Sequence, residues 1–136
     1  MGKKIIGRLE KISILDLELF DLDAKVDTGA DSSALHCDHV VVDDSMVSFT
    51  LLDEVHEAYN NKRFSLPIYK IKKVKSSNGE LQIRPSIKVS VEFYGKQYKS
   101  VISLTDRKDM KFPMLIGRRF LKDKYLVDVA LEYVAK

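Results

Sequence analysis

Residues 24–35 read Ala24-Lys25-Val26-Asp27-Thr28-Gly29-Ala30-Asp31-Ser32-Ser33-Ala34-Leu35, in which an apolar strand pattern runs into an acid, a hydroxyl and a glycine. The apolar residues Phe20, Leu22, Ala24 and Val26 alternate with other residues, and this period of two predicts a half-buried β-strand. Gly29 permits the sharp turn that follows, so Asp27 is presented at the end of a strand beside backbone N–H groups. An aspartate in such a turn is most often only a turn-former, because its side chain bonds its own backbone.

A second feature is the run Phe112-Pro113-Met114-Leu115-Ile116-Gly117-Arg118, which is almost continuously apolar until Gly117 and Arg118 end it. A continuous apolar strand is one that is buried on both faces, so this strand belongs in the centre of a small domain. Residues 119–124 then have a short helical pattern. The chain therefore combines a turn-borne acid with a later, fully buried strand.

The composition fits one globular domain over residues 1–136, with 45% hydrophobic residues and a net charge of only +3. The densest basic run, residues 70–75, alternates with Ile and Val, which predicts a strand with one solvated face and not a nucleic-acid footprint. The single cysteine, Cys37, excludes an intramolecular disulfide and suits a reducing compartment. The N-terminus starts like a signal peptide, but its apolar region stops at Arg8, and no window is apolar enough for a membrane helix. We therefore expect a cytoplasmic protein that engages neither nucleic acid nor membrane.

Most of the remaining chain has the pattern of short strands separated by turns. Two β-prone arms, 68–74 and 81–83, flank Ser76-Ser77-Asn78-Gly79, and Asn-Gly is the strongest short hairpin signal because both residues tolerate positive φ. A second hairpin is predicted over residues 87–104, with its turn at 94–97. Many short strands with one brief helix predict an all-β barrel or sandwich.

A strand ending in Asp27-Thr28-Gly29-Ala30, followed later by an apolar strand ending in Ile116-Gly117-Arg118, resembles the retropepsin family of aspartic proteases. The resemblance implies a small closed barrel with one short C-terminal helix, in which two strands cross beneath the catalytic Asp27. Aspartic-protease chemistry needs two carboxylates, one to deprotonate water and one to protonate the scissile carbonyl. The chain has a single Asp-Ser/Thr-Gly, so such a site would need a homodimer in which each copy gives Asp27.

The same resemblance assigns supporting roles around Asp27. Thr28 would hydrogen-bond across the twofold axis, and Gly29 and Ala30 would let the backbone of a substrate approach closely. Asp31 and Arg118 would form a bidentate ion pair that braces the active turn. A flap would close over the substrate and exclude water, and it would be formed by Ser76, Ser77, Asn78 and Gly79.

The match is closer with a bacterial family associated with the ligase RimK and long labelled as ATP-dependent zinc proteases. The shared blocks keep their order along the chain, and they are residues 25–36, 74–80, 84–85, 104–110, 113–118 and 126–128. This chain departs from the family pattern at Asp31, where the family has Arg. The Asp31–Arg118 pair would therefore be particular to this member.

The zinc and ATP parts of that label find no support in the residues. A helical zinc site needs His-Glu-x-x-His, but His56-Glu57 lacks the second histidine. His36, Cys37 and His39 are near neighbours on a strand pattern, where adjacent side chains point to opposite faces, so packing explains them better than zinc. Gly95-Lys96-Gln97 lacks both the earlier glycine and the following Ser or Thr of a phosphate loop. We expect neither a metal nor a cofactor.

Two functions of different classes remain open. The first is a dimeric aspartic endopeptidase that acts on a peptide or protein substrate through Asp27. The second is a non-catalytic accessory module that uses the protease fold to bind a RimK-like ATP-grasp glutamate ligase. The intact Asp27-Thr28-Gly29 favours the first, because a binding module does not need a carboxylate in that turn. A fold and a motif do not by themselves establish turnover.

Overall fold

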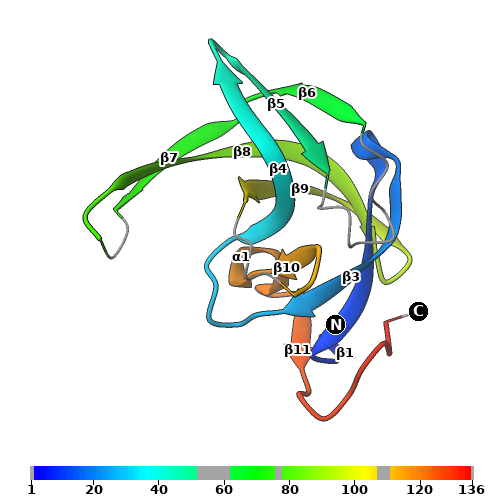
Figure 1. The fold of residues 1–136 in the computed structure, drawn as a ribbon. Coiled ribbons are helices and arrows are strands. Elements are labelled where there is room, and N and C mark those ends of the chain that lie inside the picture. Colours follow the sequence, from blue (N-terminus) through cyan, green and yellow to red (C-terminus); the bar gives the residue numbers. More distant parts are fainter. Residues whose placement is uncertain (1, 52–61, 76–77, 107–110, 136) are drawn as a thin grey trace.

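The computed structural model describes residues 2–51, 62–75, 78–106 and 111–135, and strands dominate it (Figure 1). In chain order the elements are β1 Lys4–Ile6, β2 Leu9–Ile14, the 3₁₀ turn η1 Leu15–Leu17, β3 Leu19–Val26, β4 Ser33–Asp43, β5 Met46–Leu51, β6 Arg63–Pro67, β7 Lys70–Lys75, β8 Leu81–Phe93, β9 Lys96–Thr105, β10 Met114–Ile116, α1 Arg118–Leu121 and β11 Tyr125–Val127. None of the helices in these described ranges is long and apolar enough to cross a membrane.

Within the described residues, six strands close into a ring in the order β10, β3, β2, β8, β9 and β4, and β4 pairs back onto β10. The β3–β10 and β4–β9 pairs are parallel, whereas the other pairs in the ring are antiparallel. Closure leaves no strand of the ring with an unpaired edge. The prediction of a small closed all-β barrel with one short helix near the C-terminus is confirmed.

β3 carries the chain into the Asp27 turn, and its buried side chains include Leu22, Ala24 and Val26. The prediction that Phe20 shares this buried face is wrong, because its side chain is 64% exposed. Asp21 has a left-handed φ of 54°, and the β2–β3 register shifts at this point, so the alternation of sides is interrupted. The period-of-two pattern therefore holds only for the part of β3 that leads directly to the site.

β10 lies in the barrel wall with a paired strand on each side, β3 on one and β4 on the other. Met114 and Ile116 are buried, as predicted from the continuous apolar run. The register pairs Ile116 with Val26, so β10 and β3 end side by side. Because these two strand ends are adjacent, Gly117 and Asp27 enter the same corner of the molecule.

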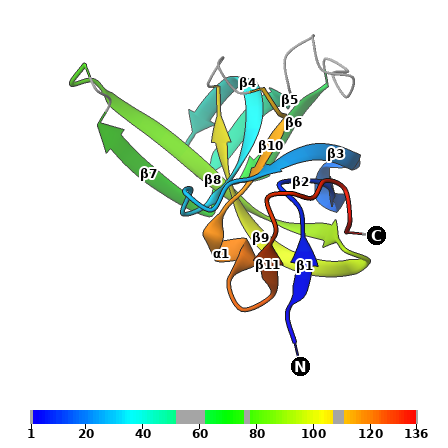
Figure 2. The ribbon, with the colours of Figure 1, turned by 90° about the horizontal axis from the view of Figure 1, so that it is seen from below.

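Both predicted hairpins form, and β8 is one continuous strand that serves both. Its first part pairs with β7 and its later part with β9, so the separate arms expected at 81–83 and 87–93 are joined. Tyr94 and Gly95 turn between β8 and β9 with φ of 55° and 74°, the positive angles that suit a tight hairpin. Figures 1 and 2 show the β7–β8 arm extending away from the barrel.

The short helix α1 is held by tertiary packing, because four residues are too few to be stable as an isolated helix. Phe120 is buried and meets Phe93 edge-to-face at a centroid distance of 5.5 Å. Tyr125 of β11 also packs on Phe93, at 5.2 Å. These contacts tie the segment after Gly117 to the barrel and so give the corner where Asp27 and Gly117 meet a rigid backing.

Candidate active site

Asp27 follows the last residue of β3 and is held by backbone contacts on both sides. Its N–H donates to the carbonyl of Ile116 at 2.9 Å, which continues the parallel β3–β10 ladder by one step. Its carbonyl accepts from the N–H of Ala30 at 3.1 Å, which closes the turn. The carboxylate is half-buried, and its Oδ1 accepts from the N–H of Gly29 at 3.0 Å. The carboxylate is therefore presented in a defined orientation by main-chain groups.

The loop after Asp27 is fastened to the start of α1. The first N–H groups of a helix have no partner inside the helix, and here two of them donate to loop carbonyls. Arg118 N–H donates to the carbonyl of Ala30 at 2.8 Å, and Arg119 N–H donates to the carbonyl of Asp31 at 3.0 Å. The buried Ser33 hydroxyl accepts from the N–H of Gly117 at 3.1 Å.

Gly117 is required by close approach of two backbones. A Cβ at this position would lie 2.5 Å from the carbonyl carbon of Ser32 and 2.6 Å from its carbonyl oxygen. Both distances are shorter than any tolerated contact, and the atoms involved are main-chain atoms that cannot rotate away. The Gly in the Ile-Gly-Arg motif therefore permits the crossing of the Asp27 loop and the segment that leads from β10 into α1.

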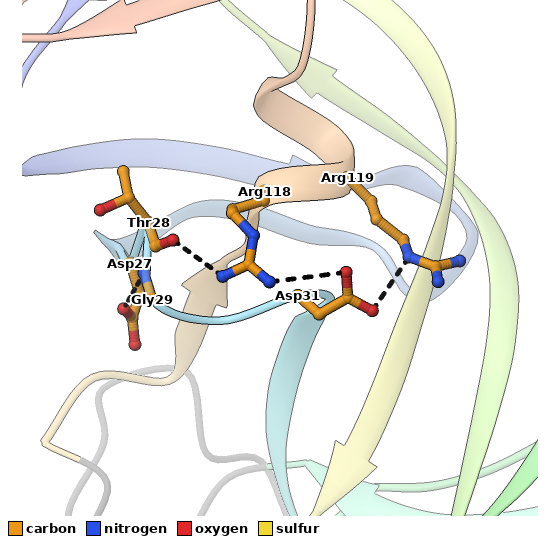
Figure 3. Close-up of polar contacts among 6 residues, drawn as sticks. All are labelled: Asp27, Thr28, Gly29, Asp31, Arg118 and Arg119. Carbon is orange, nitrogen blue, oxygen red and sulfur yellow. Dashed lines mark hydrogen bonds and ion pairs between the residues drawn. The ribbon is translucent and has the colours of Figure 1, made fainter.

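Asp31 lies between two guanidiniums at the surface of this corner (Figure 3). Arg119 Nε donates to Oδ2 at 3.1 Å, whereas Arg118 Nη2 is 3.8 Å from Oδ1. The hydrogen bond from Arg119, together with the positive charges of Arg119, Lys72 and Arg118, holds the pKa of Asp31 below its ordinary value. The Asp31 side chain remains 45% exposed, so this carboxylate is charged and accessible.

The predicted ion pair between Asp31 and Arg118 is present, with Nη2 and Oδ1 at 3.8 Å, but it is not the expected bidentate contact. Arg118 Nη1 donates to the carbonyl of Thr28 at 3.0 Å, so one side of its guanidinium holds the turn after Asp27 directly. Arg119 is the residue that donates a hydrogen bond to the Asp31 carboxylate, and the sequence analysis did not predict this role for it. The doubled Arg after Ile116-Gly117 was the available signal, because a carboxylate has two oxygens that can serve two cations.

The remaining residues predicted around Asp27 lie as follows. Thr28 and Gly29 are exposed, and Ala30 is half-buried. A Cβ at Gly29 would lie 3.2 Å from Asp27 Oδ1, a tight contact that would push this carboxylate oxygen aside by a few tenths of an ångström. These positions leave the surface of the turn open to solvent. The expected contact of Thr28 across a twofold axis remains a prediction.

The predicted flap lies at the end of the β7–β8 arm. Gly79 has φ of 87°, and the N–H of Glu80 donates to Asn78 Oδ1 at 3.2 Å. Ser76 and Ser77 lie outside the described residues. A cavity lies between the base of this arm and the loop after Asp27, because Arg84 of β8 lines it together with Ala30 and Asp31. The arm and the loop are thus neighbours in space.

The histidine and cysteine residues considered for zinc differ in how far they are buried. His36 and Cys37 are buried in β4, whereas His39 is exposed with φ of 52°. Burial raises the pKa of the Cys37 thiol well above its usual value, which makes it a poor nucleophile. The described residues contain no group of three or more His, Cys, Asp or Glu that could hold a metal ion. His56 and Glu57 lie outside the described residues.

Curated relatives match nearly the whole chain. A "Probable alpha-L-glutamate ligase" of Desulfotalea psychrophila is 29% identical over 140 residues, which cover 97% of this chain. A protein of the same description from Shewanella halifaxensis is 31% identical over 135 residues, which cover 93% of this chain. The match takes in 29% of either relative, so this chain spans well under half of their length.

A solved structure and a protein family match as well. The crystal structure of a Legionella pneumophila protein of unknown function superposes with a TM-score of 0.75 at 28% identity, covering 99% of this chain and 100% of that one. Residues 5–136 match the RimB-like family, described as "Retropepsin-like aspartic endopeptidase RimB". This chain therefore belongs to the RimB-like family of retropepsin-like aspartic endopeptidases.

Proposed function

We propose that this protein hydrolyses peptide bonds as a homodimer, with a water activated between the Asp27 carboxylates of two copies. The observation that carries the proposal is the presentation of Asp27: its half-buried carboxylate is oriented by Gly29 N–H at the meeting point of β3 and β10. The Gly29 N–H contact would equally suit an aspartate that only shapes the turn, so what favours catalysis is the open surface beside it: Thr28 and Gly29 are exposed, and Asp27 is only half-buried. A general base must reach the proton that it removes, and the exposed surface of this turn leaves the Asp27 carboxylate accessible.

The chemistry requires a pair of carboxylates. One accepts a proton from the attacking water while its protonated twin donates to the scissile carbonyl oxygen. Two carboxylates that lie close together resist double ionisation, so one proton is shared, and the apparent pKa values belong to the pair. The chain carries one Asp-Thr-Gly, and a second copy supplies the other Asp27 through a twofold axis.

An exposed apolar surface near the site supports the assembly of two copies. Ile5 of β1 and Leu126 of β11 are directly opposite in the two-stranded sheet, and they are 51% and 53% exposed. Figure 2 shows β1 and β11 side by side at one end of the molecule. Leu126 and Thr28 line a common cavity, so this surface reaches the active turn. Apolar surfaces of this kind favour association.

The substitution Asp27→Asn tests the catalytic role. It keeps the size of the side chain and removes the ionisable group from both copies, so we expect cleavage to fall by orders of magnitude, since general acid–base contributions are each worth about 10²–10⁴-fold. Cleavage of a peptide library should be measured from acidic to neutral pH, with a maximum on the acidic side. The exposed Asp43→Asn is the matched control. Full activity in the Asp27→Asn protein would exclude this mechanism.

The substitution Leu126→Asp tests the shared site. Because Leu126 is exposed, the variant should fold, but two added charges at a twofold contact should keep it monomeric and inactive. Val41→Asp, at a 50% exposed position on β4, is the control and should behave like the wild type. Sedimentation and specific activity should be followed over a dilution series. A monomer with undiminished specific activity would contradict the dimeric site.

A second candidate function is supported by the curated relatives. They are described as alpha-L-glutamate ligases, and this chain matches 29% of their length, so a domain like this one accompanies a ligase there. The domain would then act as an accessory module that binds a RimK-like ATP-grasp ligase. This function predicts that Asp27→Asn leaves ligase binding intact and that the wild type cleaves no peptide at any pH.

A further inference from the structure

Ser33 carries a buried hydroxyl at the start of β4, next to the loop after Asp27. The residue is 3% exposed, and the pairing of β4 with β9 fixes its backbone in the barrel wall. Its hydroxyl oxygen accepts from the N–H of Gly117 at 3.1 Å. The register of β4 with β10 ends at Ala34 and Leu115, so Gly117 lies beyond the last paired position. The Ser33 side chain therefore extends by one contact a ladder that the main chain has ended.

The N–H that Ser33 holds belongs to the same peptide unit as the carbonyl that holds Asp27. The Ile116 carbonyl accepts from the Asp27 N–H at 2.9 Å, and the Gly117 N–H is the other polar group of that unit. A peptide unit is planar and rigid, with its N–H and C=O pointing in opposite directions. A rotation of this plane that breaks the contact with Ser33 therefore also turns the carbonyl away from Asp27.

Gly117 leaves its peptide unit in need of a restraint. A Cβ at this position would lie 2.5 Å from the carbonyl carbon of Ser32, so the residue must be glycine, which restricts the backbone least. The next peptide unit has a restraint of its own, because the Arg118 N–H donates to the Ala30 carbonyl at 2.8 Å. The Ser33 hydroxyl supplies the corresponding restraint for the unit before it.

We propose that Ser33 is a positioning residue for catalysis, which fixes the Asp27 carboxylate through the peptide unit that joins Ile116 to Gly117. This inference rests on the proposed function. In a site made by two copies, a displacement of Asp27 occurs on both sides of the twofold axis, so the separation of the carboxylates changes twice over. Catalysis is sensitive to such shifts, because a misplacement of about 1 Å can cost about 10²-fold in rate. The loss should fall on kcat and not on KM, since the open surface of the turn is unchanged.

The matched comparison is between two buried serines that make the same kind of bond. Ser13, on β2, is 7% exposed, and its hydroxyl accepts from the Asp21 N–H at 2.9 Å. Ser33→Ala and Ser13→Ala should therefore lower Tm by similar amounts, because each leaves one main-chain N–H without its acceptor. Only Ser33→Ala should reduce kcat, by at least about tenfold with an unchanged KM, because only its N–H belongs to a peptide unit that holds Asp27.

A conservative series separates the hydroxyl from the volume of the side chain. Ser33→Thr should restore kcat to within about threefold of the wild type, since a threonine hydroxyl accepts as a serine hydroxyl does. Ser33→Cys keeps the approximate size but offers only a weak acceptor, so it should lose as much kcat as Ser33→Ala. Wild-type kcat in Ser33→Cys, or equal losses of kcat in Ser33→Ala and Ser13→Ala, would overturn the inference.

Amide hydrogen exchange, followed by NMR, gives a readout that needs no cleavage. We expect the Asp27 N–H to exchange at least about tenfold faster in Ser33→Ala than in the wild type, because its hydrogen bond opens more often. The Val26 N–H donates to the Arg8 carbonyl at 2.9 Å, and as the control on the same strand it should exchange at an unchanged rate. Unchanged exchange at Asp27 would reject the positioning role, whether or not the protein cleaves peptides.

The two experiments together distinguish this inference from the proposed function. If the wild type cleaves peptides and Ser33→Ala keeps full kcat, the endopeptidase is supported and the positioning role is rejected. If the Asp27 N–H exchanges faster in Ser33→Ala but the wild type cleaves nothing, the connection from Ser33 to Asp27 is supported and the endopeptidase is rejected.

Discussion

Glu10 and Asp31 are both carboxylates that fasten one segment of the chain to another, but their surroundings are opposite. Glu10 is fully buried and accepts from the N–H groups of Gly7, Val134 and Ala135 at 2.7, 3.2 and 3.0 Å. Asp31 is 45% exposed and faces guanidinium groups. The first joins the C-terminal segment to the N-terminal strands, and the second joins the active loop to α1.

The contrast separates a structural carboxylate from one that is available to a ligand. Backbone amides around Glu10 are fixed by the chain and are shielded from water, so loss of the carboxylate leaves buried donors unpaired. The guanidiniums around Asp31 lie at the surface and can exchange their partner for solvent or for another anion. Stability should therefore depend strongly on Glu10, whereas Asp31 should matter mainly for the site.

The largest expected effect on stability is that of Glu10→Ala. Three N–H groups lose their acceptor, and we expect the free energy of unfolding to fall by about 3 kcal/mol or more. Urea denaturation measures this, and Glu92→Ala, at an exposed position of β8, is the matched control with little change. A loss as small as that of the control would show that the Glu10 contacts do not hold the C-terminal segment.

An intermediate loss of stability is expected at two glycines, Gly7 beside Glu10 and Gly117 beside the Asp31 loop. A Cβ at Gly7 would lie 2.3 Å from the carbonyl oxygen of Leu131, and one at Gly117 would lie 2.5 Å from the carbonyl carbon of Ser32. Gly7→Ala and Gly117→Ala should each cost about 1–3 kcal/mol by overpacking. Only Gly117→Ala should also abolish peptide cleavage, because it displaces the Asp27 loop. Gly2→Ala meets nothing within 4 Å and is the control. Equal activity losses in both variants would remove the distinction between the regions.

The smallest effect on stability is expected for the Asp31–Arg119 pair. The pKa of Asp31 is lowered in the folded protein, so its contribution is present above the unfolded value near 3.8 and is lost as the pH falls through the lower folded value. The stability difference between wild type and Asp31→Asn should therefore shrink only in strong acid. A double-mutant cycle with Arg119→Gln measures the coupling, and a matching cycle with Arg118→Gln should give less. Additivity in both cycles would show that Asp31 interacts with neither guanidinium.

Local patterns predicted the elements that position the site. The alternation before Asp27 and the continuous apolar run at 112–116 correspond to β3 and β10, and positive φ at Gly79 and Gly95 accompanies the two predicted hairpins. The exception in β3 is Phe20, where a register shift with β2 reverses the side that faces the core. A one-residue shift of this kind depends on the partner strand, so it is not readable from the pattern of one strand alone.

Glu10 shows what a pattern can indicate without revealing the partner. It is in phase with the buried Ile12 and Ile14, so the spacing on β2 fits an acid on the core side, although no such prediction was made for Glu10. Its three donors come from Gly7 and from a segment more than a hundred residues later. No rule of spacing connects those positions.

The sequence by itself determined the turn that presents Asp27, the buried strand beside it, the glycine at position 117 and the single Asp-Thr-Gly from which the proposed homodimer follows. These features depend only on residues that are close together in the sequence. The period of apolar residues defines a strand, a glycine permits a turn or a close approach, and one motif occurs once. Only the tertiary structure decided that Arg119 is the hydrogen-bonded partner of Asp31, that Glu10 holds the C-terminal segment, and that Lys72, Arg84 and Lys99 share one cavity. These contacts arise because closure of the ring and the registers of β7, β8 and β9 bring distant residues together, and that geometry is a property of the assembled barrel.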